Sequence, residues 1–231
     1  MTNNKKNDNN KVKIDDRFSV YRDDTSIKHA QDFLCNHISS KISLLIVYAD
    51  LVGSTKMSMT MPVDKLVTII RTFSHEMSSV VESYGGYILK YVGDAVIAFF
   101  APSFNRYLPC DKAVRCAQSM INVIKNGINP ILKNYDYPEV SLKISIDKGE
   151  IVVVQHAYDK SSQIDVLGYV MNVAAKIISL TNSNRLSVGE NVYKLLHPSI
   201  QAEFHELIYR IGEWDYINRD TDKLYKVYTL N

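Results

Sequence analysis

The chain has 231 residues, 46% of them hydrophobic, which is enough to bury a sizeable core in one domain with extensions. Its 27 basic and 25 acidic residues leave a net charge of only +2. Nucleic acids and anionic membranes both require a concentrated basic surface, so this balance argues against either as the main partner. We therefore expect a small-molecule partner.

The cysteines and histidines show no ligand spacing. Cys35, Cys110 and Cys116 lack a Cys-x-x-Cys pattern and are predicted to be buried or free thiols in a reducing compartment. The six histidines are scattered without zinc-ligand spacing. No apolar run approaches the length of a bilayer span, and no signal peptide is evident. We expect a cytoplasmic protein without a membrane span.

The N-terminal part divides into two segments. Residues 1–12 are polar and rich in asparagine, and they are predicted to be disordered. Residues 13–40 form a lead segment whose apolar side chains recur at helical spacing. Those side chains are Ile27, Ala30, Phe33, Leu34 and Ile38. A short helix is predicted there, packed on the domain or on a partner subunit, and residues 41–231 are predicted to form the main domain.

The main domain alternates between strand and helix periodicity. Strands are predicted at residues 42–48, 87–91, 95–100, 140–146, 151–155 and 164–167. Helices are predicted at residues 62–84, 111–127 and 169–180. Two β-rich runs, Leu207–Trp214 and Leu224–Leu230, are predicted to form a C-terminal hairpin. This order predicts an α+β fold with a ferredoxin-like βαββαβ core, in which helices pack on one face of an antiparallel-rich sheet.

Two acidic turns carry the main functional signal. Asp50 follows an apolar strand, and Asp94 precedes another, so both carboxylates are predicted at one edge of a single sheet. Magnesium usually takes one or two carboxylates together with phosphate oxygens. The turn Gly53-Ser54-Thr55, followed by a helix, offers N–H groups to phosphate. Alternatively, Asp50 and Ser54 only cap a turn and a helix, and Asp94 lies in an ordinary hairpin.

Four motifs occur in a characteristic order. They are A-D-L-x-G-S-T from Ala49, G-G-x-x-x-K-x-x-G-D from Gly85, the stretch Lys143–Val153, and D-x-x-G-x-x-x-N-x-A-x-K from Asp165. Together they resemble the catalytic domain of class III nucleotidyl cyclases. The resemblance runs from about Ser43 to about Leu196, and more loosely to Leu230.

The resemblance implies a two-metal site. Asp50, Asp94 and the backbone carbonyl of Leu51 match positions that hold two Mg²⁺ or Mn²⁺ ions in the family. Gly53, Ser54 and Thr55 match the phosphate loop.

The resemblance also implies how the nucleobase is recognised. Lys90 and Asp165 match the pair that reaches the purine from the partner subunit. A lysine that donates to adenine N1 and an aspartate that accepts from the exocyclic amine favour ATP, whereas guanylate cyclases usually carry glutamate at the position of Lys90. Pyrimidine triphosphates remain alternative substrates, since some bacterial members of this superfamily use them. Lys90 as an exposed strand residue and Asp165 as a turn residue are the structural alternatives.

Two further positions are expected on one helix face. Asn172 matches the asparagine that orients the ribose, and Lys176 stands where most active members carry an arginine that stabilises charge on the α-phosphoryl group. Lysine keeps the charge but loses the planar fork of donors, which predicts weak activity. The i to i+4 spacing keeps both residues on one face.

Besides Lys176, a second difference from the family pattern lies near the C-terminus. The family's lysine for the terminal phosphates aligns with Ile217, so Arg219 and Lys223 are the substitutes available, and both are equally consistent with solvated turn charges. The metal residues and the base residues are expected at opposite ends of one protomer. The resemblance therefore implies a head-to-tail homodimer with two sites across its interface.

The sequence thus predicts an adenylate cyclase that converts ATP to cyclic AMP and pyrophosphate. The alternatives are a weak or silent nucleotide-binding module, suggested by Lys176 and Ile217, and a cyclase for GTP or a pyrimidine triphosphate. A diguanylate cyclase would need a G-G-[DE]-[DE]-F pattern, where this chain has Gly85-Gly86-Tyr87-Ile88.

Overall fold

The computed structural model describes residues 25–156, 163–209 and 212–230. The predicted disordered segment 1–12 lies outside these residues. The strands are β1 (Lys41–Leu51), β2 (Tyr87–Val92), β3 (Ala95–Phe100), β4 (Leu142–Gln155), β5 (Ile164–Leu167), β6 (Arg185–Gly189), β7 (Phe204–Glu206) and β8 (Val227–Leu230). The helices are α2 (Thr25–Cys35), α3 (Ser54–Thr60), α4 (Val63–Ser83), α5 (Leu108–Asn122), the π-helix η1 (Val123–Ile128), α6 (Asn129–Asn134), α7 (Tyr169–Leu180), α8 (Glu190–Tyr193) and α9 (Pro198–Gln201).

The strands form one mostly antiparallel sheet in the order β2-β3-β1-β4-β6-β8-β7, with β5 paired to β4. The pairing of β4 with β6 is parallel. β1 lies at the centre, with β3 on one side and β4 on the other. This sheet confirms the predicted α+β class. Across the described ranges, no helix combines the length and the apolarity needed to cross a bilayer.

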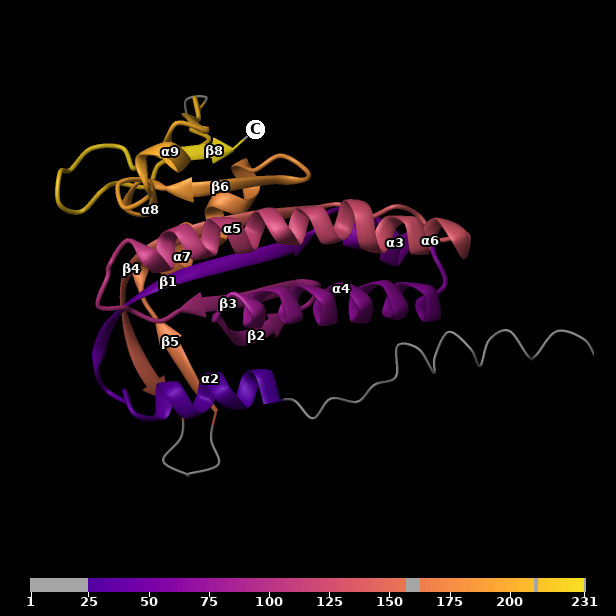
Figure 1. Ribbon diagram of the computed structural model, residues 1–231, viewed down its shortest axis with the longest axis horizontal. Coiled ribbons are helices and arrows are strands. Elements are labelled where there is room, and N and C mark those ends of the chain that lie inside the picture. The colour runs from indigo at the N-terminus through magenta and orange to yellow at the C-terminus, as the bar shows by residue number, and fades with distance from the viewer. Residues whose placement is uncertain (1–24, 157–162, 210–211, 231) are drawn as a thin grey trace, which may run out of the picture.

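Helices cover both faces of the sheet. Leu45 and Val47 of β1 pack in a core with residues of α4 and α5, and the alternate residues Leu44 and Ile46 pack with residues of α2 and α7. Figure 1 shows α4 and α5 running side by side, with α2 next to β5 at the far side. The expectation of helices on one face therefore fits α4 and α5 but not α2 and α7. The continuous apolar run in β1 is the sequence feature that corresponds to two buried faces.

The strand that carries Gly149 differs from its prediction. Two strands separated by a glycine turn were expected, but β4 runs unbroken from Leu142 to Gln155. Gly149 lies inside this strand because α7 packs closely on it, and an added Cβ would stand 3.0 Å from the Cβ of Val170. The direction of the chain reverses only after β4, where β5 pairs with its second half.

Other boundaries also shift. The helix expected at residues 111–127 begins at Leu108 and continues through η1 into α6. The predicted C-terminal hairpin is only partly correct, because β8 lies within the second predicted run but its partner β7 ends at Glu206, before the first predicted run begins. Trp214 is buried, and its Nε1 donates a 2.7 Å hydrogen bond to the carbonyl of Tyr225. That residue is therefore held by its side chain, outside the described strands.

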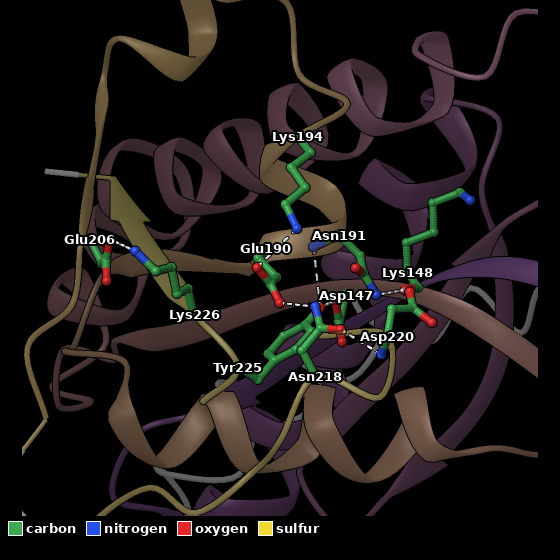
Figure 2. Close-up of polar contacts among 10 residues, drawn as sticks. All are labelled: Asp147, Lys148, Glu190, Asn191, Lys194, Glu206, Asn218, Asp220, Tyr225 and Lys226. Atoms are coloured by element: carbon green, nitrogen blue, oxygen red, sulfur yellow. Dashed lines mark hydrogen bonds and ion pairs between the residues drawn. The ribbon is translucent and has the colours of Figure 1, made fainter. Parts of the chain in front are cut away.

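A buried polar cluster ties the C-terminal segment to β4 and α8 (Figure 2). Asp147 is 2% exposed, and its Oδ1 accepts a 2.6 Å hydrogen bond from the Tyr225 hydroxyl. The same hydroxyl accepts from the backbone N–H of Asn191 at 3.2 Å, and Asn191 Nδ2 donates to the carbonyl of Lys148 at 3.0 Å. Gly189 leaves the space that the carboxylate fills, since an added Cβ would clash with Asp147.

A second part of this cluster holds the turn before β8. Asn218 Nδ2 donates to Glu190 Oε1, and Lys194 Nζ donates to Glu190 Oε2 at 3.0 Å. Asn218 Oδ1 accepts from the backbone N–H of Asp220 at 2.9 Å. The position of Arg219, between Asn218 and Asp220, is therefore fixed from both sides.

Asp147 makes stability depend on pH. Burial raises the pKa of Asp147 to about 7, against the opposing effect of the Tyr225 hydrogen bond. An unfolded aspartate titrates near 4, so the folded protein binds the extra proton between about pH 4 and pH 7. The free energy of unfolding contributed by this group is therefore present below about pH 4 and is lost as the pH rises through about 7.

We predict that Asp147→Asn flattens this dependence. Asparagine still accepts from Tyr225, so the variant should lose less stability than wild type between pH 5 and pH 8, by about 3 kcal/mol, because the folded pKa of about 7 lies two pH units above the start of this range. Urea unfolding at the two pH values measures this. Exposed Asp215→Asn serves as the control. Equal pH dependence in wild type and Asp147→Asn would contradict the assignment.

Candidate active site

The two predicted metal carboxylates are close enough to influence each other. Asp50 lies near the end of β1 opposite Lys143 of β4, and Asp94 lies in the β2–β3 turn after Gly93, whose φ is +62°. Burial raises the pKa of Asp50, the Asp94 carboxylate raises it further, and Lys143 lowers it. The prediction that both carboxylates lie at one edge of the sheet is consistent with this interaction.

The acidic pair fits a divalent cation. Asp94 Oδ2 is buried, and it has no hydrogen-bond partner among the described residues. A buried carboxylate oxygen without a partner is costly, and a second carboxylate nearby increases that cost, unless a cation is bound. In the described ranges, no three His, Cys, Asp or Glu side chains gather as a ligand set. Two carboxylates plus substrate oxygens are what Mg²⁺ commonly takes, so the residues present fit such an ion.

The expected phosphate loop follows directly after β1. Gly53 adopts φ +78° and precedes α3, and its carbonyl accepts from the N–H of Met57 at 2.9 Å. An added Cβ at Gly53 would meet no atom within 4 Å, so this glycine is required for its backbone angle. Ser54 and Thr55 begin the helix, where N–H groups lack intrahelical acceptors. The loop is thus formed next to Asp50.

Lys90 of β2 and Asp165 of β5 form an ion pair within one chain. Lys90 Nζ lies 2.5 Å from Asp165 Oδ2, and the two side chains are 29% and 17% exposed. Asp165 Oδ1 accepts from the N–H of Val166 at 2.8 Å, and His156 Nε2 lies 3.9 Å from Oδ2. The structure therefore brings the two predicted base-recognition residues together.

Two observations relate this ion pair to the acidic pair. Burial and the Asp165 carboxylate raise the pKa of Tyr48, which is two residues before Asp50 on the same face of β1. Lys90 is four residues before Asp94 on the strand that leads into its turn. The Asp165 carboxylate therefore influences a residue two positions from Asp50, and the expectation that the two groups lie at opposite ends of one protomer stays a prediction.

Asn172 and Lys176 lie on the exposed face of α7, as their spacing predicts. Within the described part of the chain, neither side chain makes a hydrogen bond or an ion pair, so the structure does not join them to the acidic pair. Arg219 stacks on Tyr169 at the start of α7, with its Cζ 4.1 Å from the ring centre. Lys223 is exposed in the turn, where its carbonyl accepts from the N–H of Asn218.

Sequence reasoning missed two neighbours of the site. Lys143 opposes Asp50 through the register of β1 and β4, and alignment of the two strands could have found it. His156 lies near Asp165 although its surrounding sequence carries no local signal for that contact. Both contacts depend on which strands pair and in which register, and local sequence patterns do not reveal this.

The fold is that of an α+β domain with a mostly antiparallel sheet, and comparison with known proteins gives its family. Residues 38–216 match the family model of the adenylate and guanylate cyclase catalytic domain. The chain belongs to this family.

Named relatives differ in substrate. A cytidylate cyclase of Escherichia coli is 21% identical over 204 residues, covering 81% of this chain and 43% of the relative. A uridylate cyclase of Burkholderia cepacia is 26% identical over 160 residues, covering 68% of each chain. This chain thus spans less than half the length of the first of these relatives.

Solved structures share the fold. The adenylyl cyclase CyaB from P. aeruginosa superposes with a TM-score of 0.69 at 19% identity, covering 83% of this chain and 95% of that one. The guanylyl cyclase Cya2 gives a TM-score of 0.69 at 18% identity, with 83% and 93% covered. The family and the fold are therefore shown, while these neighbours are named for different nucleotides.

We predict that Asp50→Asn stabilises the metal-free protein and removes its response to metal. The substitution relieves repulsion from Asp94, which should raise the melting temperature by a few degrees, an effect below about 1 kcal/mol after solvent screening. Mg²⁺ or Mn²⁺ should raise the melting temperature of wild type but not of the variant. Thermal unfolding with and without metal measures both, with exposed Glu203→Gln as control. An undiminished metal response in Asp50→Asn would exclude this site.

Proposed function

We propose that the chain is an adenylate cyclase, which converts ATP to cyclic AMP and pyrophosphate with two Mg²⁺ or Mn²⁺ ions. The observation that carries this proposal is the acidic pair, in which the pKa of Asp50 is raised and Asp94 Oδ2 has no hydrogen-bond partner among the residues that the structure describes. Asp50, Asp94 and the carbonyl of Leu51 would hold the ions. Bound there, the ions would lower the pKa of the ribose 3′-hydroxyl and neutralise the departing pyrophosphate.

The remaining residues bind and orient the substrate. Backbone N–H groups of Gly53, Ser54 and Thr55 donate to phosphate oxygens at the start of α3. Asn172 orients the ribose, and Lys176 balances charge that develops on the α-phosphoryl group. For a base to bind, Lys90 and Asp165 must exchange their mutual ion pair for contacts with the base edge.

The ion pair supports a class of base. A lysine donor beside a carboxylate acceptor matches a ring nitrogen acceptor next to an exocyclic amine, as in adenine N1 and N6 and equally in cytosine N3 and N4. Guanine and uracil present the reverse order. The relative named as a cytidylate cyclase therefore makes CTP the second candidate substrate, and ring size rather than hydrogen bonding would separate it from ATP.

We propose a head-to-tail homodimer as the active form. Support comes from α7, where Asn172 and Lys176 are exposed and make no side-chain contact within the described chain. Docking this face on the acidic pair of a second protomer would give both residues a charged partner and complete the site.

We predict cyclic AMP from ATP, or cyclic CMP from CTP, with Mg²⁺ or Mn²⁺, and little product from GTP or UTP. Chromatography of reactions with all four triphosphates measures this, beside an Asp50→Ala, Asp94→Ala double variant that should form no product. Product only from GTP or UTP would overturn the roles of Lys90 and Asp165 and keep the mechanism. No product from a confirmed dimer would favour a silent nucleotide-binding module.

We predict that Lys176→Arg raises kcat. Arginine restores a planar fork that contacts two phosphoryl oxygens at once, and one additional charge-assisted hydrogen bond in the transition state is worth about tenfold in rate. Initial rates at saturating substrate measure the effect, with exposed Lys112→Arg of α5 as the matched control. An unchanged or lower kcat in Lys176→Arg would place this residue outside the reacting centre.

A further inference from the structure

The lead helix α2 packs on the two strands that carry the base-recognition pair. Its principal contacts are with β2, the strand of Lys90, and with β5, the strand of Asp165. Ala30 and Leu34 are fully buried in this contact. Figure 1 shows α2 beside β5, and α2 packs on the face of the sheet opposite to α4 and α5. The helix α2 therefore contacts both strands that carry the ion pair, β2 with Lys90 and β5 with Asp165.

The contact with β5 is a two-way hydrogen bond from a side chain to the backbone. Gln31 Nε2 donates to the carbonyl of Ile164 at 3.0 Å, and the N–H of Ile164 donates to Gln31 Oε1 at 3.0 Å. β5 is a four-residue strand whose partner in the sheet is β4. The amide of Gln31 thus takes the place of a neighbouring strand at the other edge of β5. Ile164 directly precedes Asp165, so this bond fixes the backbone that carries the carboxylate.

The contact with β2 is aromatic. The centroid of the Phe33 ring lies 5.3 Å from that of Tyr87 in β2 and 5.5 Å from that of Phe99 in β3. The rings of Tyr87 and Phe99 stack with their centroids 5.0 Å apart. Tyr87 is three residues before Lys90 on the same strand. The aromatic group thus anchors β2 to the same helix turn from which Gln31 reaches β5.

We propose that Gln31 is a positioning residue for nucleotide selectivity. By bonding Ile164 while Phe33 packs on Tyr87, it sets the separation of Asp165 and Lys90, and so decides which base edge the two side chains fit. The proposal rests on the proposed role of Lys90 and Asp165 in base binding. It assigns α2 a function that depends on neither the metal nor the phosphate loop.

The test compares the wild type with Gln31→Met and with Lys28→Met, a matched change at an exposed position of the same helix. Methionine keeps the length of glutamine but removes both hydrogen bonds. Gln31→Met should raise KM for the preferred triphosphate about fivefold to tenfold, as expected for one or two lost hydrogen bonds, with kcat within about twofold. Selectivity over the poorest triphosphate should fall by the same factor. Lys28→Met should change neither value.

A purely structural role for Gln31 would reduce kcat equally for all four triphosphates and leave KM and selectivity unchanged, and that result would overturn the proposal. If Gln31→Met does not fold, Gln31→Glu keeps the acceptor for the Ile164 N–H and should give a smaller loss of selectivity.

The same series separates this proposal from the proposed function. If wild type forms a cyclic nucleotide and Gln31→Met keeps the same selectivity, the positioning role of Gln31 is overturned and the proposed function is not. If wild type forms no product, calorimetric binding of the four triphosphates gives the same comparison of selectivity. A wild type that binds none of them overturns both proposals.

Discussion

The repulsion between the carboxylate of Asp50, near the end of β1, and that of Asp94, in the β2–β3 turn, is the constraint on which the candidate site depends. Asp50 and Asp94 come from different elements, and the repulsion between their negative charges would move them apart if the backbone allowed it. They stay together because β1 is hydrogen-bonded on both sides, to β3 and β4, and because both of its faces are buried. The free energy of the core thus offsets the cost of an incompletely paired acidic site.

The elements around this site could be predicted where the signal is local. The helix expected at residues 169–180 has those bounds, and β3 and the glycine turn before Asp94 also follow the prediction, because periodicity and turn residues determine them. The prediction of a turn at Gly149 is wrong because a glycine in a strand resembles a turn in sequence, and the close approach of Val170 explains why glycine stands there. The packing of α2 and α7 on the second face of the sheet likewise could not be predicted from local patterns, because it depends on tertiary contacts.

The candidate site shows the same division. Asp50 and Asp94 could be found because each sits in a short motif, and their mutual influence follows from neighbouring strands. The ion pair of Lys90 and Asp165 joins residues 75 positions apart in the sequence, and the hydrogen bond of Gln31 to Ile164 joins residues 133 positions apart. Side-chain contacts at such separations depend on strand register and helix placement, which local patterns do not contain. Family resemblance identified the first pair, and nothing in the sequence indicated the second.

The position of α2 has a consequence for where the folded unit begins. The family match starts at residue 38, after α2 has ended at Cys35. A chain cut at that boundary would expose the free edge of β5 together with the apolar surface that Ala30 and Leu34 now cover. An unpaired strand edge beside an apolar surface is a template for association with other chains. By occupying that edge with a side-chain amide, α2 protects each protomer against strand addition.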